Sequence, residues 1–374
     1  MSKPIRILQV FAQMNRGGAE TMIMNLYRNI DRSKIQFDFV VHTNNKCDYD
    51  DEINALGGVI YSIPRYTGKN HFQYKKSWYN LLKQHPEYKI IHGHVRSTAA
   101  IYLNIANEFG LMTVAHSHST SSGEGLSAFI KNALQYRIRF TADYLFACSK
   151  TAGEWLFGEK ATKNENFLIL NNAIDAKKYI YNEQVRKMKR NELRMDNSFI
   201  IGHIGRFSTP KNHDFLIDVF NEVYKKNKNA KLILVGDGNL RDYIMKKVNR
   251  LGLCEVIFFT GLRTDISELL QAMDIVVFPS LYEGLPVTII EAQASGLPCL
   301  VSNRITKEVK ITKLVEFLSL EDDAELWAKK TIEISEGFER ENMYNEIVLG
   351  EYDIKSVSKK YEELFAENKK VLFT

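Results

Sequence analysis

The chain of 374 residues carries a formal net charge of +5, with 45% hydrophobic and 25% charged residues. This length and apolar content suffice for two globular cores and exclude an intrinsically disordered chain. The basic excess is small and forms no dense stripe with interleaved aromatic residues, which argues against a nucleic acid partner and fits an anionic ligand or membrane surface.

In chain order, short β-branched runs alternate with helical patterns over the first half. Strands are expected at Ile5–Phe11, Gln36–His42, Val59–Ile63, Lys89–His92, Met112–His116, Tyr144–Cys148 and Phe167–Leu170, and helices at Glu20–Asn29, Thr98–Glu108 and Ala128–Phe140. The polar stretch Asn171–Asn197 is expected to hold a linker and a charged helix.

The alternation then starts again. Strands are expected at Phe199–Ile204, Lys231–Val235, Val256–Thr260, Asp274–Pro279 and Cys299–Ser302, and helices at Asp214–Lys225, Leu240–Leu251, Asp265–Ala272, Pro286–Ser295 and Asp353–Ala366. Such alternation predicts parallel sheets covered on both faces. We therefore predict an α/β protein with two doubly wound, Rossmann-like domains at residues 1–175 and 176–353, followed by a separate helical segment at 354–374.

The compartment is indicated by the cysteines and by the lack of targeting signals. No run of about 18 apolar residues would span a membrane, and no small-residue cleavage site follows the first apolar run. The four cysteines lie far apart and form no CxxC pair, as is typical of reduced thiols. We expect a cytoplasmic protein.

The richest motif follows the strand that ends near Phe278. Pro286 suits the first position of the next helix, whose free backbone amides would form a phosphate site. Glu283 and Glu291 lie eight residues apart and would reach two parts of one ligand, where carboxylates accept hydrogen bonds from sugar hydroxyls. The alternative is a solvated loop glutamate and a helix glutamate in an ion pair.

Two loops near other strand ends carry further candidates. Arg206 and Lys211 follow the strand at 199–204 and would neutralise a diphosphate, although surface cations are the plainer interpretation. Gly17 and Gly18 lie between the first strand and the first helix and would allow close backbone approach to a ligand. They do not form GxGxxG, so a nicotinamide cofactor is poorly supported.

Two His-x-His runs end neighbouring strands. Alternate residues of a strand share a face, so the pairs His92/His94 and His116/His118 could each converge on a metal. No acidic third ligand lies at an indicative spacing, which favours histidines that line a ligand cleft or cap the sheet.

Two weaker patterns remain. Asp48 and Asp50 form a DxD pair in a polar loop without supporting context, so a surface role is favoured over metal binding. Lys131, Arg137 and Arg139 lie on a basic amphipathic stretch that would rest on an anionic bilayer or pack on the first sheet with a solvated edge.

Together these motifs resemble glycosyltransferase family 4. Glu283 and Glu291, with Gly-Leu-Pro after the first of them, resemble the E-x7-E signature of retaining glycosyltransferases, and Arg206 with Lys211 resembles the phosphate clamp of that group. In the second half the resemblance extends to Val235–Gly238 and Phe259–Asp265. In the first half it is looser and rests on Gly17–Glu20 and Ala115–His118. It implies the GT-B fold, with a first domain for the acceptor, a second for the donor, a cleft between them, and a terminal helix that packs back toward the first domain.

The resemblance also implies roles for individual residues. Arg206 and Lys211 would neutralise the donor diphosphate, Glu283 would hold hydroxyls of the transferred sugar, Glu291 would hold the ribose, and His116 or its rival His118 would face the sugar. Residues expected to line the donor site elsewhere are Gly17, Gly18, Gly236, Gly238, Gly261, Leu262, Arg263, Gly284, Leu285, Pro286 and Val287. No metal or cofactor is expected, because the cations and amides replace it.

These expectations predict a retaining glycosyltransferase that uses a nucleoside-diphosphate sugar, with uridine favoured as the base. The acceptor would be a saccharide, in particular a lipid-linked intermediate of bacterial capsule or exopolysaccharide synthesis, reached by peripheral contact with the anionic inner membrane face. The alternatives are a nucleotide-sugar hydrolase or epimerase of the same fold, a non-catalytic partner protein, and a zinc hydrolase built on the His-x-His pairs.

Overall fold

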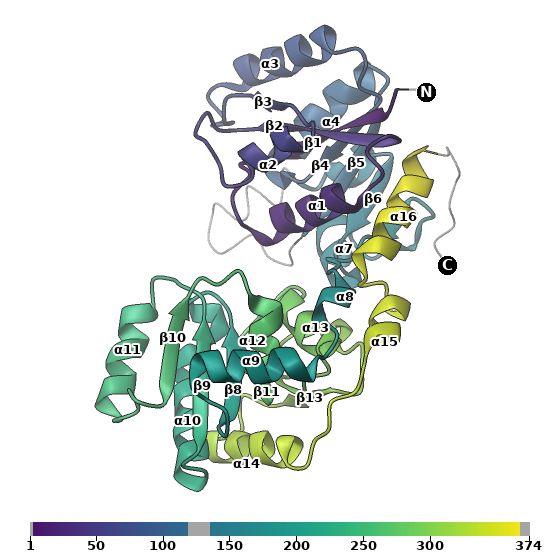
Figure 1. The fold of residues 1–374 in the computed structure, drawn as a ribbon. Helices are drawn as coiled ribbons and strands as arrows, with labels where there is room; N and C mark the ends of the chain where they lie inside the picture. The colour runs from purple at the N-terminus through teal and green to yellow at the C-terminus, as the bar shows by residue number, and fades with distance from the viewer. Residues whose placement is uncertain (1–2, 119–134, 367–374) are drawn as a thin grey trace. The chain divides into compact units, whose positions relative to one another are not determined.

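The computed structural model describes residues 3–118 and 135–366, and the chain divides into two compact units (Figure 1). Unit 1 runs to Ala173 and includes the segment from Ile354 onward, whereas unit 2 is Ile174–Asp353. Each unit is built on one parallel β-sheet with helices packed on its faces.

Unit 1 contains a seven-stranded sheet in the order β3-β2-β1-β4-β5-β6-β7. Its elements are β1 (Ile5–Phe11), α1 (Gly18–Asn29), β2 (Ile35–Val41), α2 (Asp50–Ala55), β3 (Ile60–Ser62), α3 (His71–Gln84), β4 (Ile90–Gly93), η1 (Arg96–Thr98), α4 (Ala99–Glu108), β5 (Met112–Ser117), α6 (Ile138–Thr141), β6 (Tyr144–Ala147), α7 (Lys150–Phe157), η2 (Ala161–Lys163), β7 (Phe167–Ile169) and α16 (Ile354–Ala366). Strand β1 pairs in parallel with β2 and β4, and the winding direction reverses between β1 and β4.

The central strand β1 is buried on both faces, which is why its sequence is nearly all apolar. Ile7 and Phe11 pack into one hydrophobic cluster, and Leu8 and Val10 pack into the cluster on the opposite face. Gln9 interrupts this run and is fully buried on the same face as Ile7.

Helix α16 returns to unit 1, as predicted. Its apolar stripe, which includes Tyr361, Leu364 and Phe365, enters the same cluster as Ile7. The Tyr361 ring lies edge-on to Phe37 of β2, and α16 also packs against α1. Helix α16 therefore completes a core that begins with the first strand.

Unit 2 contains a six-stranded sheet in the order β10-β9-β8-β11-β12-β13. Its elements are α8 (Ala176–Tyr179), α9 (Glu183–Leu193), β8 (Phe199–Ile204), η3 (Thr209–Lys211), α10 (His213–Lys226), β9 (Ala230–Val235), α11 (Arg241–Arg250), β10 (Ile257–Gly261), α12 (Ile266–Ala272), β11 (Ile275–Phe278), α13 (Val287–Ala294), β12 (Cys299–Ser302), η4 (Lys307–Val309), β13 (Val315–Leu318), α14 (Ala324–Ser335) and α15 (Tyr344–Leu349). The winding reverses between β8 and β11, so this sheet repeats the plan of unit 1.

The structure differs from the predicted elements in a few places. Helices α2, α3, α7, α14 and α15 and strand β13 were not predicted. Pro286 is the residue before helix α13 rather than its first residue, because its backbone is extended and its carbonyl accepts the amide of Ile289. Residues 128–134 of the helix predicted near Arg137 lie outside the described residues, and α6 covers the end of that stretch.

Candidate active site

Ligands of doubly wound sheets bind beyond the carboxyl ends of the strands, where the winding reverses. In unit 2 this point lies between β8 and β11, and the two loops that follow these strands are hydrogen-bonded to each other. The Asn212 side chain donates to the Pro279 carbonyl at 3.1 Å, and the Leu281 amide donates to the Pro210 carbonyl at 2.8 Å. These bonds hold the loop that carries Arg206 and Lys211 beside the loop that carries Glu283.

Lys211 and Glu283 form an ion pair across these two loops. Lys211 Nζ lies 2.8 Å from Glu283 Oε1, and the two side chains are only 16% and 18% exposed. The ammonium also lies 4.5 Å from the centre of the Phe278 ring, a cation–π contact at the end of β11. The structure therefore brings Lys211 beside the Glu283 loop, and the lysine has a carboxylate partner.

Arg206 is the second predicted cation. It follows Gly205 at the end of β8, its side chain is exposed, and no carboxylate of the described residues forms an ion pair with it. The loop that carries it packs against the loop after β9, where a Cβ on Gly236 would lie 2.2 Å from the Gly205 carbonyl oxygen. Gly236 also has a φ of +135°, so glycine is required there for both reasons.

The segment before α13 places its backbone beside the Lys211–Glu283 pair. Gly284 is half-buried, whereas Leu285 and Pro286 are buried, and Val287 begins the helix. The first-turn amides of a helix carry partial positive charge and are free to bind an anion. The loop thus joins one paired lysine with a helix N-terminus.

Glu291 lies in the second turn of α13 and has a partner that the sequence did not reveal. The Tyr179 hydroxyl at the end of α8 donates to Glu291 Oε1 at 2.6 Å. Burial raises the pKa of Glu291 from 4.5 to about 7, against the opposing effect of the tyrosine hydrogen bond. Without a ligand this carboxyl group is poised to titrate near neutral pH.

The other predicted nucleotide residues follow β9 and β10. Gly238 packs against the Phe207 backbone, where a Cβ would lie 2.5 Å from the carbonyl oxygen. Gly261 has a φ of +69°, and the following residue, Leu262, is 83% exposed. The Arg263 guanidinium donates two hydrogen bonds to the Asp265 carboxylate, at 2.7 and 2.6 Å, so its Nε–H and Nη2–H donors already have a partner.

In unit 1 the two His-x-His runs form one cluster at the carboxyl ends of β4 and β5, in which His118 is half-buried and the other three rings are buried. His92 Nε2 lies 3.1 Å from His116 Nδ1, and His94 Nδ1 lies 2.7 Å from His118 Nε2. Burial lowers the pKa of all four imidazoles, that of His118 to about 3, so they are neutral near pH 7. His116 lies in β5, and His118 is the first residue after its end.

Gly17 and Gly18 lie where helix α1 begins, with Gly17 as the residue before the helix. A Cβ on Gly17 would lie 2.3 Å from the Glu20 carboxylate, so the absence of a side chain lets this carboxylate fold back over the helix N-terminus. Burial raises the pKa of Glu20.

The weaker patterns have structural explanations. The Asp48 carboxylate accepts a hydrogen bond from the Arg16 backbone amide at 3.0 Å, and the Asp50 carboxylate accepts one from the Cys47 amide at 2.8 Å, so both aspartates order loops.

Among the described residues, the side chains whose ligating atoms lie close enough together to bind one metal ion are His92, His94 and His116. All four cysteines are free, in keeping with the expected thiols.

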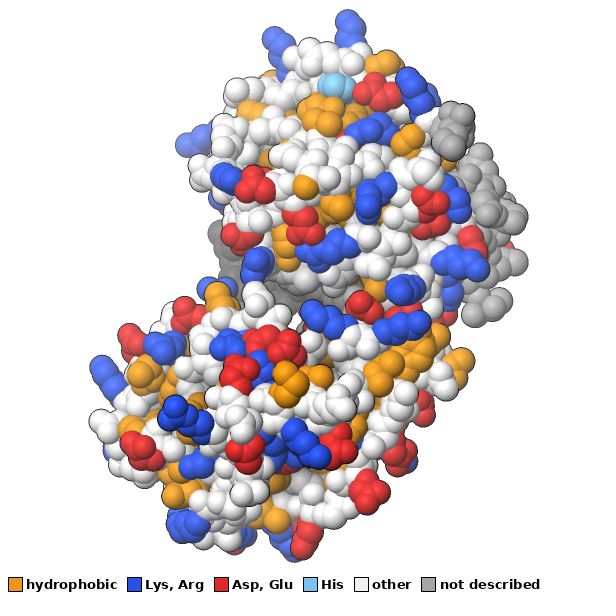
Figure 2. All heavy atoms as spheres, in the orientation of Figure 1, with side chains coloured by type: hydrophobic (Ala, Val, Ile, Leu, Met, Phe, Trp, Pro, Cys, Tyr) orange, Lys and Arg blue, Asp and Glu red, His pale blue; other side chains and the backbone are white. Residues whose placement is uncertain are grey.

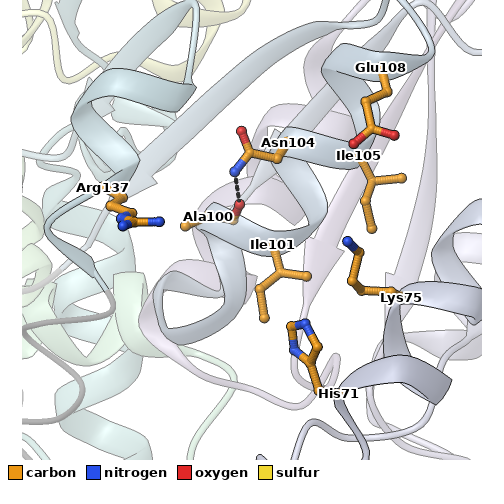
Figure 3. A pocket seen from close by; sticks show the side chains of 8 residues that line it. All are labelled: His71, Lys75, Ala100, Ile101, Asn104, Ile105, Glu108 and Arg137. Atoms are coloured by element: carbon orange, nitrogen blue, oxygen red, sulfur yellow. Dashed lines mark hydrogen bonds between the residues drawn. The ribbon is translucent and has the colours of Figure 1, made fainter.

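A surface groove of about 400 Å³ lies between α3 and α4 of unit 1 (Figure 3). Its wall combines apolar side chains (Ile101, Ile105) with cationic ones (Lys75, Arg137) and one carboxylate (Glu108), and His71 lies at one end. On the face drawn in Figure 2, Lys and Arg side chains alternate with Asp and Glu rather than forming one stripe. Lys131 lies outside the described residues, and no helix within them is long and apolar enough to cross a bilayer.

Comparison with known proteins identifies the class. The sequence matches the family descriptions Glycosyltransferase Family 4 over residues 16–178 and Glycosyl transferases group 1 over residues 198–336. The protein named as glycosyltransferase EpsF of Bacillus subtilis (strain 168) is 37% identical over 332 residues, 87% of this chain and 86% of that protein. The UDP-Gal:alpha-D-GlcNAc-diphosphoundecaprenol alpha-1,3-galactosyltransferase of Escherichia coli is 28% identical over 61% of this chain and 60% of its own.

Among solved structures, Anabaena Alr3699/HepE in complex with UDP and glucose superposes with a TM-score of 0.74 at 18% identity, over 96% of this chain and 99% of the other. The two doubly wound units and this likeness define an enzyme of the GT-B fold. The chain belongs to glycosyltransferase family 4. The fold, the family and the enzyme class predicted from the motifs are therefore confirmed.

Proposed function

We propose that this glycosyltransferase is a retaining enzyme that takes a hexose or N-acetylhexosamine from a UDP-sugar. Its acceptor is a saccharide, in particular a lipid-linked intermediate of capsule or exopolysaccharide synthesis. The observation that carries the proposal is the Lys211–Glu283 pair at the β8/β11 switch point, 2.8 Å long and next to the α13 N-terminus. The UDP in the HepE complex and the donor and acceptor in the Escherichia coli enzyme's name support the choice of substrates.

In the proposed reaction the bond between sugar C1 and the diphosphate oxygen breaks while a bond from C1 to an acceptor oxygen forms on the same face. A departing phosphate oxygen takes the acceptor proton. Arg206 and Lys211 stabilise the negative charge that grows on the leaving group, together with the amides of Gly284 and Leu285. No covalent enzyme intermediate is part of the proposed reaction, and these cations take the role that a metal has in other transferases.

Other residues bind the remaining parts of the donor. Glu283 accepts hydroxyls of the transferred sugar and Glu291 those of the ribose. Residues Gly236–Gly238 and Gly261–Arg263 border the nucleotide. From unit 1, His116 and His118 contact the sugar, and Gly17 and Gly18 approach the diphosphate.

Thermal stability in the presence of nucleotides tests the donor assignment. UDP at about 100 times its dissociation constant is expected to add about 2.7 kcal/mol of stability, and GDP and ADP less at equal concentration. Arg206→Ala should reduce the UDP shift, whereas Arg250→Ala, a change at the far end of α11, should not. An equal response to all three nucleotides would contradict the preference for uridine.

Product analysis separates the proposed transferase from a nucleotide-sugar hydrolase or epimerase of the same fold. A transferase releases UDP in proportion to added acceptor, whereas a hydrolase or epimerase consumes the UDP-sugar without it. A non-catalytic partner protein does neither. The anomeric configuration of the product, determined by NMR, decides between retention and inversion.

Membrane contact is proposed for the face around the α3/α4 groove. Phe72 and Phe140 are 87% and 74% exposed, and their neighbours His71 and Arg137 line the same groove. Exposed aromatic rings beside cations favour an anionic interface.

Phe72→Ser with Phe140→Ser is expected to weaken binding to phosphatidylglycerol vesicles about tenfold for each ring that enters the bilayer. Leu349→Ser, which removes a side chain that is 82% exposed in unit 2, serves as the matched control. Sedimentation with vesicles measures the effect. Unchanged binding of the double variant would assign contact to another surface.

A further inference from the structure

Four histidines of unit 1, the buried His92, His94 and His116 and the half-buried His118, belong to one hydrogen-bonded network that begins at a single glutamine. Gln9 Oε1 lies 2.9 Å from His94 Nε2, and Gln9 Nε2 lies 3.4 Å from the Tyr361 hydroxyl. The Tyr361 hydroxyl in turn lies 3.1 Å from His92 Nδ1. Two branches therefore leave the Gln9 amide, one through α16 and one directly into the histidines.

The orientation of the Gln9 amide, with Nε2 toward Tyr361 and Oε1 toward His94, sets the direction of the first branch. The Gln9 amide N–H donates to the Tyr361 oxygen, so the tyrosine proton is free to be donated to His92 Nδ1. A neutral imidazole carries one proton, so His92 bears it at Nε2 and donates to His116 Nδ1. His116 must then carry its own proton at Nε2, a buried atom without a partner in the described part of the chain.

The second branch runs in the opposite sense. The Gln9 carbonyl oxygen only accepts, so His94 carries its proton at Nε2 and offers a lone pair at Nδ1. His118 donates to that lone pair from Nε2. Its Nδ1 is left with a lone pair and is likewise buried without a partner among the described residues.

We propose that Gln9 is a positioning residue that, through Tyr361 and His92 on one side and His94 on the other, makes His116 present an N–H at Nε2 and His118 a lone pair at Nδ1. The ligand class that suits one donor and one acceptor on two rings stacked 4.0 Å apart is a hydroxyl-bearing sugar. This inference rests on the proposed contact of both histidines with the donor sugar.

The positions of the ring protons also argue against metal binding at these histidines. In the network the Nδ1 lone pairs of His92, His94 and His116 each accept a hydrogen bond. A zinc ion bound by His92, His94 and His116 would have to break these hydrogen bonds. It would also be buried with neutral ligands only, because this group contains no carboxylate or cysteine. The imidazoles are therefore assigned to ligand recognition through hydrogen bonds.

The network is tested by ¹⁵N NMR of the full chain with ¹⁵N-labelled histidine, because protonated and bare ring nitrogens resonate apart. All four rings are expected to be Nε2–H tautomers. Tyr361→Phe should release His92 and His116 into mixed tautomers and leave His94 and His118 unchanged, whereas Gln9→Met should release all four. A mixture in the unmodified protein, a set of Nδ1–H rings, or an equal effect of both substitutions on both branches overturns the proposal.

A matched control exists in the same unit. Gln36 Nε2 donates to the Tyr27 hydroxyl at 2.5 Å, a second buried glutamine–tyrosine pair, so Tyr27→Phe should leave all four tautomers unchanged. Zinc added to the apo protein should not shift the ring signals; a stoichiometric shift would overturn the hydrogen-bond assignment.

Activity is read separately from the tautomers. Tyr361→Phe is expected to lower kcat/KM for the donor about tenfold, the effect of one hydrogen bond to a reacting ligand, while Tyr27→Phe does not. If the tautomers respond as expected and transfer does not, the network stands and the proposed sugar contact of the histidines fails. If the tautomers do not respond, the network itself fails.

Discussion

Replacement of Lys211 by Met is expected to lower turnover by about 10²–10³-fold, the effect of removing one preorganised group from a developing anion. Methionine keeps an unbranched stem over the Phe278 ring and removes only the ammonium. Because Lys211 Nζ lies 2.8 Å from Glu283, the loss also leaves that carboxylate without its partner, so donor binding should weaken as well. Steady-state kinetics with acceptor at saturation measure both effects.

The matched control is Lys313→Met. Lys313 pairs with Glu341 at the same 2.8 Å, but the two side chains are 65% and 57% exposed, and the pair lies outside the β8/β11 switch point. Its loss should change turnover by less than about twofold, since exposed ion pairs contribute little. If Lys211→Met folds, by circular dichroism, and retains near-normal turnover, the phosphate clamp must be assigned to other residues.

The sequence revealed the sheets because parallel strands are buried on both faces and read as continuous apolar runs. The predicted bounds of β1, Ile5–Phe11, coincide with the observed ones, and β5 differs by one residue. Helix α3 was not predicted, although its buried Tyr74, Trp78 and Leu81 have the i, i+4, i+7 spacing of an amphipathic helix. The buried strands were readable as apolar runs, whereas half-exposed helices were predicted in some cases, such as α10, and missed in others, such as α3.

The site was predictable where a motif is local. Glu283, the α13 N-terminus and Glu291 belong to one continuous segment, so their spacing was visible. The contact of Glu283 with Lys211 depends on β8 and β11 becoming neighbours, which strand order and not spacing decides. Tyr179 lies more than 100 residues before Glu291, in a short helix of the linker region, and no local pattern marks it.

The histidine network shows the same limit. The His-x-His runs were visible, and two of the four rings were selected as sugar contacts. Gln9 and Tyr361 were not selected as site residues, because a lone glutamine in a strand and a tyrosine in an apolar helix stripe look like ordinary core positions. They meet because α16 returns to the face of β1 on which Gln9 points.

Replacement of Glu291 by Gln is expected to stabilise unit 2 above neutral pH. Burial raises the pKa of this carboxyl group to about 7, so between pH 4.5 and 7 the native state binds more protons than the unfolded chain. Stability therefore falls as pH rises through that window, by at most about 3 kcal/mol, and stays reduced above it. Glutamine keeps an acceptor for the Tyr179 hydroxyl and carries no charge, so the melting temperature of the variant should exceed that of the unmodified protein at pH 8 and match it near pH 4.5.

The same substitution is expected to weaken nucleotide binding, because a carboxylate offers two acceptors to the two ribose hydroxyls and the amide offers one. Loss of a hydrogen bond to a charged group corresponds to about 10–150-fold in affinity for UDP, measured by calorimetry at pH 8. In the unmodified protein UDP affinity should fall as pH drops below 7, and in Glu291→Gln this dependence should disappear. Glu346→Gln, at an exposed position of α15, should change neither property. A variant that is more stable at pH 8 yet binds UDP normally would show that Glu291 is a buried structural carboxylate and that the ribose is held elsewhere.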